Sequence, residues 1–191
     1  MDRLLEGVDF DRARTVVEFG VGTGCVTREI LRRLRPDARL ISLEINPAFV
    51  AGCTSVGDPR FTLVEGCATR LPEILRAQGV DKVDAVVSSL PLSLMDEAVV
   101  DRILDVAQDS LAPSGVFTQY QYSLSNHARM TARYGDVAVK FTLANVPPAF
   151  VYVCRQGRTT TPARKRVPSL GFLYAAALAA VAVAVRAYQQ L

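Results

Sequence analysis

The chain has 191 residues, enough for one domain with a short additional segment, and half of its residues are hydrophobic. The net charge of +3 is unevenly distributed: residues 1–136 contain 15 basic and all 19 acidic residues, whereas residues 137–191 contain seven basic residues and no acidic one. A body with a net charge of −4 argues against a general nucleic-acid-binding domain, which needs basic side chains for phosphate contacts, and the four cysteines show none of the spacings of a metal site.

Predicted strands and helices alternate along the chain. Apolar runs predict strands at residues 15–19, 39–43, 61–64, 83–88, 115–122, 137–143 and 149–154. Helices are predicted at residues 24–35, 47–56, 71–78, 95–110 and 124–134. Such alternation is typical of an α/β domain with a mainly parallel sheet covered by helices on both faces. Only residues 144–148 separate the last two strands, which is too short for a crossover helix, so we expect these strands to form an antiparallel hairpin.

The first predicted strand runs directly into three glycines, in the sequence VVEFGVGTG at residues 16–24. Glycine lets the backbone turn tightly and lets a ligand approach without a Cβ atom in the way. The spacing is GxGxG rather than the GxGxxG that holds the pyrophosphate of a dinucleotide. We interpret the turn, with Glu18 just upstream, as a ligand site. The alternative is an ordinary turn in which Glu18 pairs with a nearby arginine.

Glu44 ends the second predicted strand, twenty residues after Gly24. In dinucleotide-binding folds, an acid at this place accepts hydrogen bonds from the ribose of an adenosyl group. The alternative is a solvated residue at the start of the helix that follows Asn46 and Pro47. Because the glycine turn and Glu44 occur in register, we interpret Glu44 and the following Ile45 as parts of an adenosyl site.

Two further motifs follow later strands. The sequence EGCA at residues 65–68 comes after the third strand, and SSLPL at residues 88–92 ends the fourth, where a simple proline-terminated loop is the alternative. Tyr120 and Tyr122 are two residues apart and therefore on one face of the fifth strand. They could form an aromatic wall for a partly methylated ammonium group, or they could only pack the sheet. His127, the only histidine, is expected on the solvated surface.

Four segments within residues 11–154 together resemble a known family: VVEFGVGTGCVTREIL, LEINPAF, DAVVSSLPLSL and FTQYQYS. The chain resembles the bacterial phosphatidylethanolamine N-methyltransferases. These are class I, Rossmann-like methyltransferases that use S-adenosylmethionine, and they are related to ribosomal RNA adenine dimethylases. The resemblance implies an α/β fold with a seven-stranded sheet and a terminal antiparallel hairpin, and S-adenosylmethionine as the cofactor.

The same resemblance implies which residues bind the cofactor. Glu18 would hold the amino end of its methionine part, and the turn after the third strand would contact adenine. Related enzymes usually have an aspartate where Cys67 stands, and a thiol accepts that hydrogen bond poorly, so backbone groups of Ala68 or a neighbour would have to serve. The implied cofactor residues are Glu18, Gly20, Gly22, Thr23, Gly24, Glu44, Ile45, Gly66, Cys67, Ala68 and Ser88.

The turn at residues 88–92 stands where such enzymes present the acceptor nitrogen to the methyl group. RNA adenine dimethylases have an aromatic residue here that stacks on the flipped base, whereas this chain has Leu92, which argues against a base as substrate. The implied catalytic residues are Ser88, Ser89, Leu90, Pro91, Tyr120 and Tyr122.

The C-terminal part of the chain has the composition of a membrane anchor. Residues 1–154 are the expected methyltransferase domain, residues 155–166 a basic, mobile linker suited to anionic lipids, and residues 167–186 an anchor helix. The uncharged run at residues 167–185 would be about 28 Å long as a helix, close to the hydrocarbon thickness of a bilayer. Five basic residues precede it and only Arg186 follows, which places the domain on the cytoplasmic face of the cytoplasmic membrane, with a single span. Alternatively, the helix lies on the surface, or packs in a homodimer through Gly171 and Ala175.

These patterns together predict a phospholipid N-methyltransferase at the membrane surface. It would transfer methyl groups from S-adenosylmethionine to phosphatidylethanolamine, toward phosphatidylcholine, with membrane lipids and no nucleic acid as partners. Two alternatives stay open. One is a membrane-tethered methyltransferase that acts on RNA, protein or a small molecule, and the other is a non-catalytic module that keeps the fold.

Overall fold

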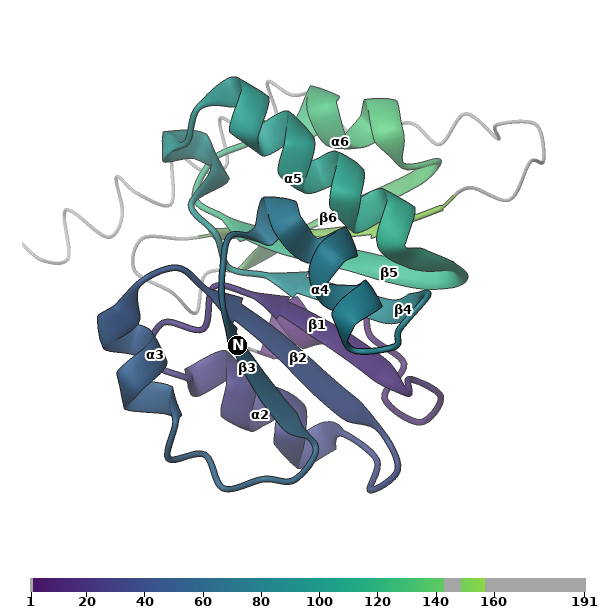
Figure 1. The fold of residues 1–191 in the computed structure, drawn as a ribbon. Helices are drawn as coiled ribbons and strands as arrows, with labels where there is room; N and C mark the ends of the chain where they lie inside the picture. Colours follow the sequence, from purple (N-terminus) through teal and green to yellow (C-terminus); the bar gives the residue numbers. More distant parts are fainter. Residues whose placement is uncertain (1, 143–148, 157–191) are drawn as a thin grey trace, which may run out of the picture.

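The computed structural model describes residues 2–142 and 149–156, which form one seven-stranded sheet with the strand order β3-β2-β1-β4-β5-β7-β6 (Figure 1). The neighbouring strands from β3 to β5 pair in parallel, and β7 pairs antiparallel with both β5 and β6. The strands are β1 (Thr15–Phe19), β2 (Arg39–Glu44), β3 (Phe61–Glu65), β4 (Val83–Ser88), β5 (Leu111–Gln121), β6 (Asp136–Thr142) and β7 (Ala149–Arg155). The predicted Rossmann-like sheet with a terminal antiparallel hairpin is confirmed.

The helices cover both faces of this sheet. They are α1 (Asp2–Leu5), α2 (Cys25–Arg33), α3 (Pro47–Cys53), α4 (Leu71–Ala77), α5 (Glu97–Ser110) and α6 (His127–Arg133), with two 3-10 turns, η1 (Ala68–Arg70) and η2 (Leu92–Leu94). Helix α5 begins two residues later than predicted because the carboxylate of Asp96 caps it, accepting the N–H of Ala98 at 2.9 Å.

The apolar core lies in two layers, one on each face of the sheet. Alternate residues of each strand enter opposite layers, so that Val17 and Phe19 of β1 pack toward α4, α5 and α6, whereas Val16 packs toward α1 and α2. Burial of each such side chain stabilises the fold by about 1.5–3 kcal/mol. The two layers fix the sheet, and with it the loops at its edges.

Strand β5 begins four residues earlier than predicted. Its pairing with β4 is irregular: Val83 of β4 lies opposite Leu111, but Ala85 lies opposite Val116. The additional residues form a bulge around Gly115, where a Cβ atom would lie 2.9 Å from the carbonyl oxygen of Ala112. The alternation of apolar residues did not predict this bulge, because a bulge interrupts the two-residue period.

None of the described helices is long and apolar enough to cross a bilayer. The predicted anchor at residues 167–186 lies outside the described residues, as does the predicted linker at residues 155–166 apart from Arg155 and Gln156.

Candidate functional site

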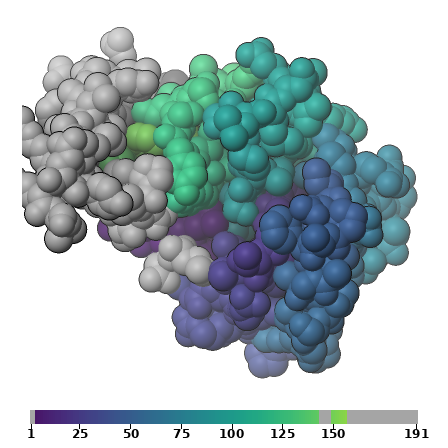
Figure 2. Space-filling view, turned by 90° about the vertical axis from the view of Figure 1, so that its left-hand side faces the viewer, coloured from purple at the N-terminus to yellow at the C-terminus, as the bar shows by residue number. Residues whose placement is uncertain are grey.

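The candidate site lies where the strand order of the sheet reverses, between the carboxyl ends of β1 and β4. In open α/β sheets this crevice is the usual place for a ligand. The turns that follow β1, β2, β3 and β4 meet at this edge. Figure 2 faces this side of the molecule, with α3 in blue and the segments that follow β4 and β5 in teal and green.

The turn after β1 is held by the end of β2. All three of its glycines have positive φ angles of 80°, 53° and 74°, which other residues rarely adopt. The N–H of Gly20 donates to the carbonyl of Leu43 at 2.9 Å, and the N–H of Gly22 donates to Oε2 of Glu44 at 3.0 Å. A Cβ atom at Gly20 would lie 3.1 Å from Leu90, whereas one at Gly22 would meet nothing within 4 Å. The backbone at Gly22 therefore borders open space, into which a ligand fits.

The end of the same turn leads into α2. Thr23 is exposed, and its carbonyl accepts a hydrogen bond from the Arg28 guanidinium at 3.0 Å. Gly24 is buried and is the N-cap of α2, which explains why this helix begins one residue later than predicted.

Glu44 is buried, and its carboxylate faces backbone amides. Oε1 accepts the N–H groups of Ile45 and Asn46, both at 2.9 Å, in addition to the bond from Gly22 to Oε2. A carboxylate accepts about four hydrogen bonds, so one acceptor position remains. The alternative of a solvated residue at the start of α3 is wrong, because Glu44 is only 7% exposed and Asn46 itself caps that helix. Ile45, in contrast, is 65% exposed.

Glu18 is a fully buried carboxyl group that is only partly satisfied. Its Oε2 accepts hydrogen bonds from the hydroxyls of Thr27 at 2.8 Å and Ser42 at 2.6 Å, whereas Oε1 has no partner within the described part of the chain. Burial raises the pKa of Glu18 to about 7, although the two hydroxyls oppose this and nearby Glu44 adds to it. The alternative of an arginine partner is wrong. A buried acid with a free oxygen gains from a cationic or N–H-bearing ligand.

The turn after β3 is hydrogen-bonded to the end of β2. The N–H of Gly66 donates to the Glu44 carbonyl at 2.9 Å. Cys67 is half-buried, and its sulfur accepts the hydroxyl of Thr69 at 3.1 Å. The side chain of Ala68 belongs to the apolar core, so only its backbone groups are available to a ligand.

The turn after β4 is tied to the glycine turn. The N–H of Ser89 donates to the carbonyl of Phe19 at 3.1 Å, and its hydroxyl donates to the carbonyl of Gly20 at 2.9 Å. Ser88 is fully buried, and its Oγ accepts the N–H of Leu90 at 3.4 Å. Both serines therefore shape the turn. Pro91 is exposed, and Leu92 is 1% exposed and packs in the core, where it is not available to stack on a base.

Sequence reasoning missed Gln119, which lies beneath this turn. Its Nε2 donates to the carbonyl of Leu90 at 2.9 Å and to the carbonyl of Tyr120 at 2.7 Å. The signal in the sequence is the pair of glutamines that alternate with the tyrosines in FTQYQYS, since a polar residue on a central strand needs a partner.

The two tyrosines are side by side, as their spacing predicts. Their rings are 5.3 Å apart and nearly perpendicular, at 86°. Tyr120 is half-buried against the core layer under α1 and α2, whereas Tyr122 is 59% exposed. Sheet packing therefore accounts for Tyr120, and Tyr122 presents an aromatic ring at the edge of the sheet.

The expectation of a solvated His127 is wrong. The residue is half-buried at the start of α6, and its ring lies 5.9 Å from that of Tyr152. Its Nδ1 is buried and has no partner among the described residues. The ring of Tyr152 beside it comes from β7, a distant part of the chain, which the local polarity of the sequence does not reveal.

The assembled site combines a bare glycine backbone with the free Oε1 of Glu18 and the one remaining acceptor position of Glu44. This arrangement suits a ligand with a cationic end near Glu18 and hydroxyl groups near Glu44. Among the described residues there is no cluster of three His, Cys, Asp or Glu side chains that could hold a metal ion.

Comparison with known sequences places these features in a family. A family model described as a methyltransferase domain matches residues 16–115. An ornithine lipid N-methyltransferase from Singulisphaera acidiphila is 35% identical over 154 residues, which cover 79% of this chain and 80% of that protein. A ribosomal RNA small subunit methyltransferase H from Bordetella petrii is 29% identical over 142 residues, which cover 67% of this chain but only 38% of that protein.

Solved structures share the fold at low sequence identity. The N-methyltransferase NodS from Bradyrhizobium japonicum matches with a TM-score of 0.65 and 12% identity, over 82% of this chain and 94% of that one. The O-methyltransferase TomG from Streptomyces achromogenes, solved in complex with S-adenosylmethionine, matches with a TM-score of 0.61 and 17% identity, over 76% and 74% of the two chains.

Proposed function

The chain belongs to the family of class I methyltransferases that use S-adenosylmethionine, and from this premise we propose that it methylates the amine of a membrane lipid head group. Phosphatidylethanolamine is the acceptor that we expect from the sequence. The head group of an ornithine lipid is a second candidate, because the relative from Singulisphaera acidiphila bears that name and aligns over four fifths of its own length. Both acceptors present a primary amine at a bilayer surface.

The described residues fit the cofactor. The free Oε1 of Glu18 suits the ammonium of the methionine part, and the backbone at Gly22 leaves space beside it. Glu44 keeps one acceptor position for a ribose hydroxyl, and Ile45 offers an exposed apolar surface for the adenine ring. The weakest fit is at Cys67, whose sulfur already accepts a hydroxyl, so we assign adenine recognition there to the backbone of Ala68.

The observation that carries the lipid proposal is where the exposed apolar side chains lie. Among the described residues, four large apolar or aromatic side chains are exposed: Ile45, Phe49, Leu94 and Tyr122. Each one follows the carboxyl end of a parallel strand. Ile45 and Phe49 follow β2, Leu94 follows β4, and Tyr122 follows β5. We call these four residues the apolar rim. They surround the same edge of the sheet that holds the glycine turn.

An apolar rim around a catalytic edge favours a lipid surface over a water-soluble substrate. Leu94 is 85% exposed, and its transfer out of water would stabilise a bound state by about 1.5–3 kcal/mol. Exposed apolar surface of this kind marks a partner or a membrane. The exposure of Ile45 is also explained by contact with the adenine ring. Leu94 and Tyr122, on the acceptor side, are therefore the stronger support for a lipid surface.

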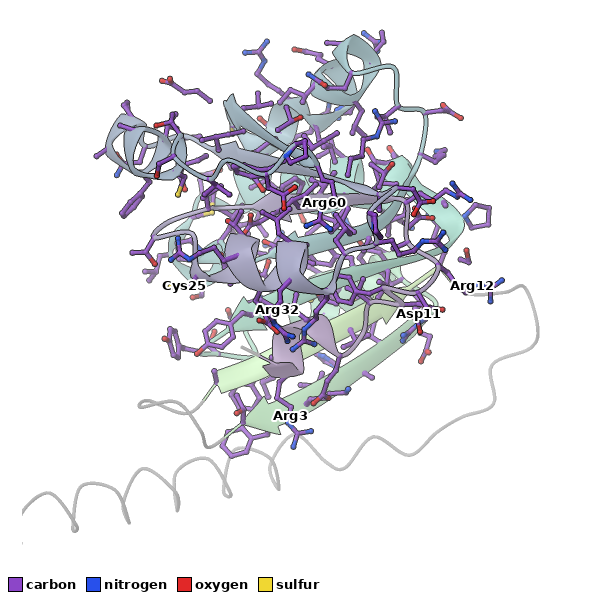
Figure 3. All side chains as sticks on the ribbon, turned by 90° about the horizontal axis from the view of Figure 1, so that it is seen from below. Arg3, Asp11, Arg12, Cys25, Arg32 and Arg60 are labelled. Atoms are coloured by element: carbon purple, nitrogen blue, oxygen red, sulfur yellow. The ribbon has the colours of Figure 1, made fainter. Side chains whose placement is uncertain are left out.

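Residues 155–166 are long enough for the carboxyl edge of the sheet and an anchor at residues 167–186 to contact the same bilayer. The described chain ends at the opposite edge of the sheet, where Arg155 pairs with Val116, just after the bulge of β5, and donates to the Gly7 carbonyl at 3.1 Å. In Figure 3, Cys25 marks the carboxyl edge, and Asp11 and Arg12 mark the amino edge. Residues 155–166 would span about 40 Å if extended, compared with about 20 Å for a six-residue strand. We therefore propose a cytoplasmic-face enzyme anchored through residues 167–186.

The chain's role in the reaction is to place a neutral amine. The cofactor supplies an activated methyl group, so proximity and orientation provide most of the acceleration, up to about 7–11 kcal/mol. We assign the turn of Ser88, Ser89, Leu90 and Pro91 to orient the amine; the Leu90 carbonyl itself already accepts the N–H of Leu92 at 2.8 Å and Nε2 of Gln119 at 2.9 Å. Tyr122 provides an aromatic face that attracts an ammonium of any degree of methylation.

An RNA acceptor is the main competing function, because ribosomal RNA methyltransferases are among the relatives. The alignment with them covers only 38% of the Bordetella petrii protein, and the buried position of Leu92 argues against base stacking. The full chain with labelled S-adenosylmethionine should be offered vesicles of phosphatidylethanolamine, vesicles containing ornithine lipid, and ribosomal RNA. Label in either lipid supports the proposal and identifies the acceptor. Label in RNA alone overturns it.

A further inference from the structure

Four buried polar atoms without a partner among the described residues lie over one face of the sheet, near the carboxyl end of β5. They are Oε1 of Gln119, Nε2 of Gln121, the hydroxyl of Tyr152 and Nδ1 of His127. Gln119 and Gln121 are two residues apart, so their side chains point to the same face. Tyr152 is opposite Gln119 in β7, and the ring of His127 lies 5.9 Å from that of Tyr152. We call these four residues the polar cluster.

Stability alone does not account for the polar cluster. The layer that contains Tyr152 is apolar, with Phe117 and Phe150 on the same face of the sheet. A buried polar atom that loses its contacts with water and gains no partner destabilises the fold, and native proteins contain few such atoms. Four of them at neighbouring positions therefore indicate a bound group that pairs with them.

The two glutamines offer opposite hydrogen-bonding groups. Nε2 of Gln119 donates to the carbonyls of Leu90 at 2.9 Å and Tyr120 at 2.7 Å, which fixes the amide and leaves Oε1 as a free acceptor. Two residues farther along β5, Oε1 of Gln121 accepts from Nδ2 of Asn126 at 3.2 Å, which leaves Nε2 as a free donor. The acceptor is thus on the side of the turn after β4, and the donor is at the end of the strand.

Two further donors lie near that of Gln121. Burial raises the pKa of Tyr152, so its hydroxyl keeps its proton and can donate. Nδ1 of His127 donates in the tautomer that carries the proton there. His127 directly follows Asn126, the partner of Gln121, and its ring lies beside that of Tyr152. The polar cluster therefore combines one free acceptor with three donors.

We infer that the polar cluster binds a zwitterionic lipid head group. Oε1 of Gln119 accepts an N–H of the amine, and the three donors hold the anionic group. This inference rests on the proposed function, which assigns the amine to the turn of residues 88–91, and Gln119 is bonded to that turn. The head groups of phosphatidylethanolamine and ornithine lipids share this chemistry, since each joins an amine to a phosphate or a carboxylate through a short carbon chain. Gln119 and Gln121 are about 7 Å apart along β5, which suits such a separation.

The polar cluster adjoins the surface at the edge that carries the apolar rim. Gln121 is the last residue of β5 and directly precedes Tyr122, which is 59% exposed. His127 is itself half-buried. A lipid whose acyl chains contact the apolar rim therefore presents its head group on the side of the polar cluster.

The test compares lipid amines with and without an anionic group. Vesicles of phosphatidylcholine, whose amine is already fully methylated, should carry phosphatidylethanolamine, ornithine lipid or stearylamine, which has no anion. The full chain with labelled S-adenosylmethionine should methylate one of the two zwitterionic lipids with a kcat/KM at least about tenfold above that on stearylamine. The lipid that is labelled identifies the anion as phosphate or carboxylate.

Two substitutions remove single donors from the polar cluster. Tyr152→Phe removes only a hydroxyl, and Gln121→Met removes the amide at nearly the same length. Each should lower kcat/KM on the zwitterionic lipid by about tenfold, because the anion loses a partner, and keep that on stearylamine within about twofold. The affinity for S-adenosylhomocysteine should be native.

Tyr134→Phe is the matched control. Tyr134 also has a buried hydroxyl without a partner among the described residues and belongs to the same apolar layer. Its ring stacks on that of Phe117 at 5.7 Å, on the amino side of Gln119. This variant should keep the native preference for the zwitterionic lipid. Thermal unfolding checks that all three variants fold.

The possible failures are distinguishable. If the native enzyme labels no lipid amine, the proposed function fails. If it labels lipid amines but methylates stearylamine as fast as the zwitterionic lipids, the proposed function stands and the head-group site is wrong. The site is also wrong if Tyr152→Phe keeps the native preference, or if Tyr134→Phe reduces it equally, since the unpartnered atoms then have no specific role toward the anion.

Discussion

Oε2 of Glu44 accepts the backbone N–H of Gly22 at 3.0 Å, so the last residue of β2 holds the turn that follows β1. The two residues are 22 positions apart in the sequence. This bond joins the two halves of the cofactor site, since a single carboxylate shapes the glycine turn and keeps an acceptor position for the ribose.

The first prediction concerns this carboxylate. Glu44→Ala removes three hydrogen bonds to the backbone as well as the acceptor for the ribose, so it should weaken the binding of S-adenosylhomocysteine by about 1–3 kcal/mol. Isothermal titration calorimetry measures this change. Glu65→Ala is the control, because Glu65 ends β3 in register with Glu44 but is exposed. NAD(H) should not compete. Equal affinities of the Glu44→Ala and native proteins would show that Glu44 does not bind the cofactor.

The second prediction follows from the raised pKa of Glu18. The folded protein holds this proton more tightly than the unfolded chain, because the pKa is about 7 in the fold and 4.5 in its absence. The free energy of unfolding of the ligand-free protein should therefore fall as the pH rises from about 4.5 to about 7. Glu18→Gln should flatten this dependence. Urea unfolding at pH values across this window tests it, and identical slopes for the two proteins would contradict it.

The third prediction uses the same group as a reporter of the cofactor. An ammonium placed beside Glu18 favours the carboxylate, so binding of S-adenosylhomocysteine near pH 6.5 should release a proton. Calorimetry in buffers of different ionisation enthalpy detects that proton. Glu18→Gln should abolish the release, and Glu65→Gln should not. A binding enthalpy that is independent of the buffer in the native protein counts against an ammonium at this position.

The fourth prediction tests the apolar rim. Leu94→Asp should lower the methylation of vesicle lipid by about tenfold or more, because it loses the transfer free energy of an exposed leucine and adds a charge repelled by anionic lipid. Ser93→Asp adds the same charge to the neighbouring exposed residue of η2 and removes no apolar side chain. Cofactor affinity should be native in both variants. If Ser93→Asp is as inactive as Leu94→Asp, the effect comes from the added charge, and the proposed contact of the apolar rim with lipid is wrong.

The fifth prediction concerns the residues beyond the described domain. A chain truncated after Arg155 should keep cofactor binding, since the residues assigned to the cofactor lie between Glu18 and Ser88, and should lose most of its activity on vesicles. If residues 167–186 span the membrane, the full-length protein should stay in the membrane fraction after alkaline carbonate extraction. A truncated chain that is as fast on vesicles as the full chain would show that the anchor is dispensable.

Much of the fold could be predicted because its signals are local. The apolar runs and the glycine turn identify each strand to within a few residues, and the short connection at residues 144–148 requires an antiparallel hairpin. The spacing between Gly24 and Glu44 predicts that they meet, since consecutive parallel strands with a crossover helix place their carboxyl ends together. The contact between Glu44 and the glycine turn confirms that the two motifs are in register.

Other features were decided only by the tertiary structure. Strand β7 lies between β5 and β6, and that position places Tyr152 beside Gln119 and under His127. Sequence periodicity reports which face a residue occupies, but not which distant residue covers it. His127 was therefore expected at the surface. Gln119 received no role because its partner, the Leu90 carbonyl, is 29 positions away and belongs to the backbone, which carries no residue-specific signal. The sequence determines the elements and the cofactor turn, whereas packing across the sheet determines how the acceptor turn is held.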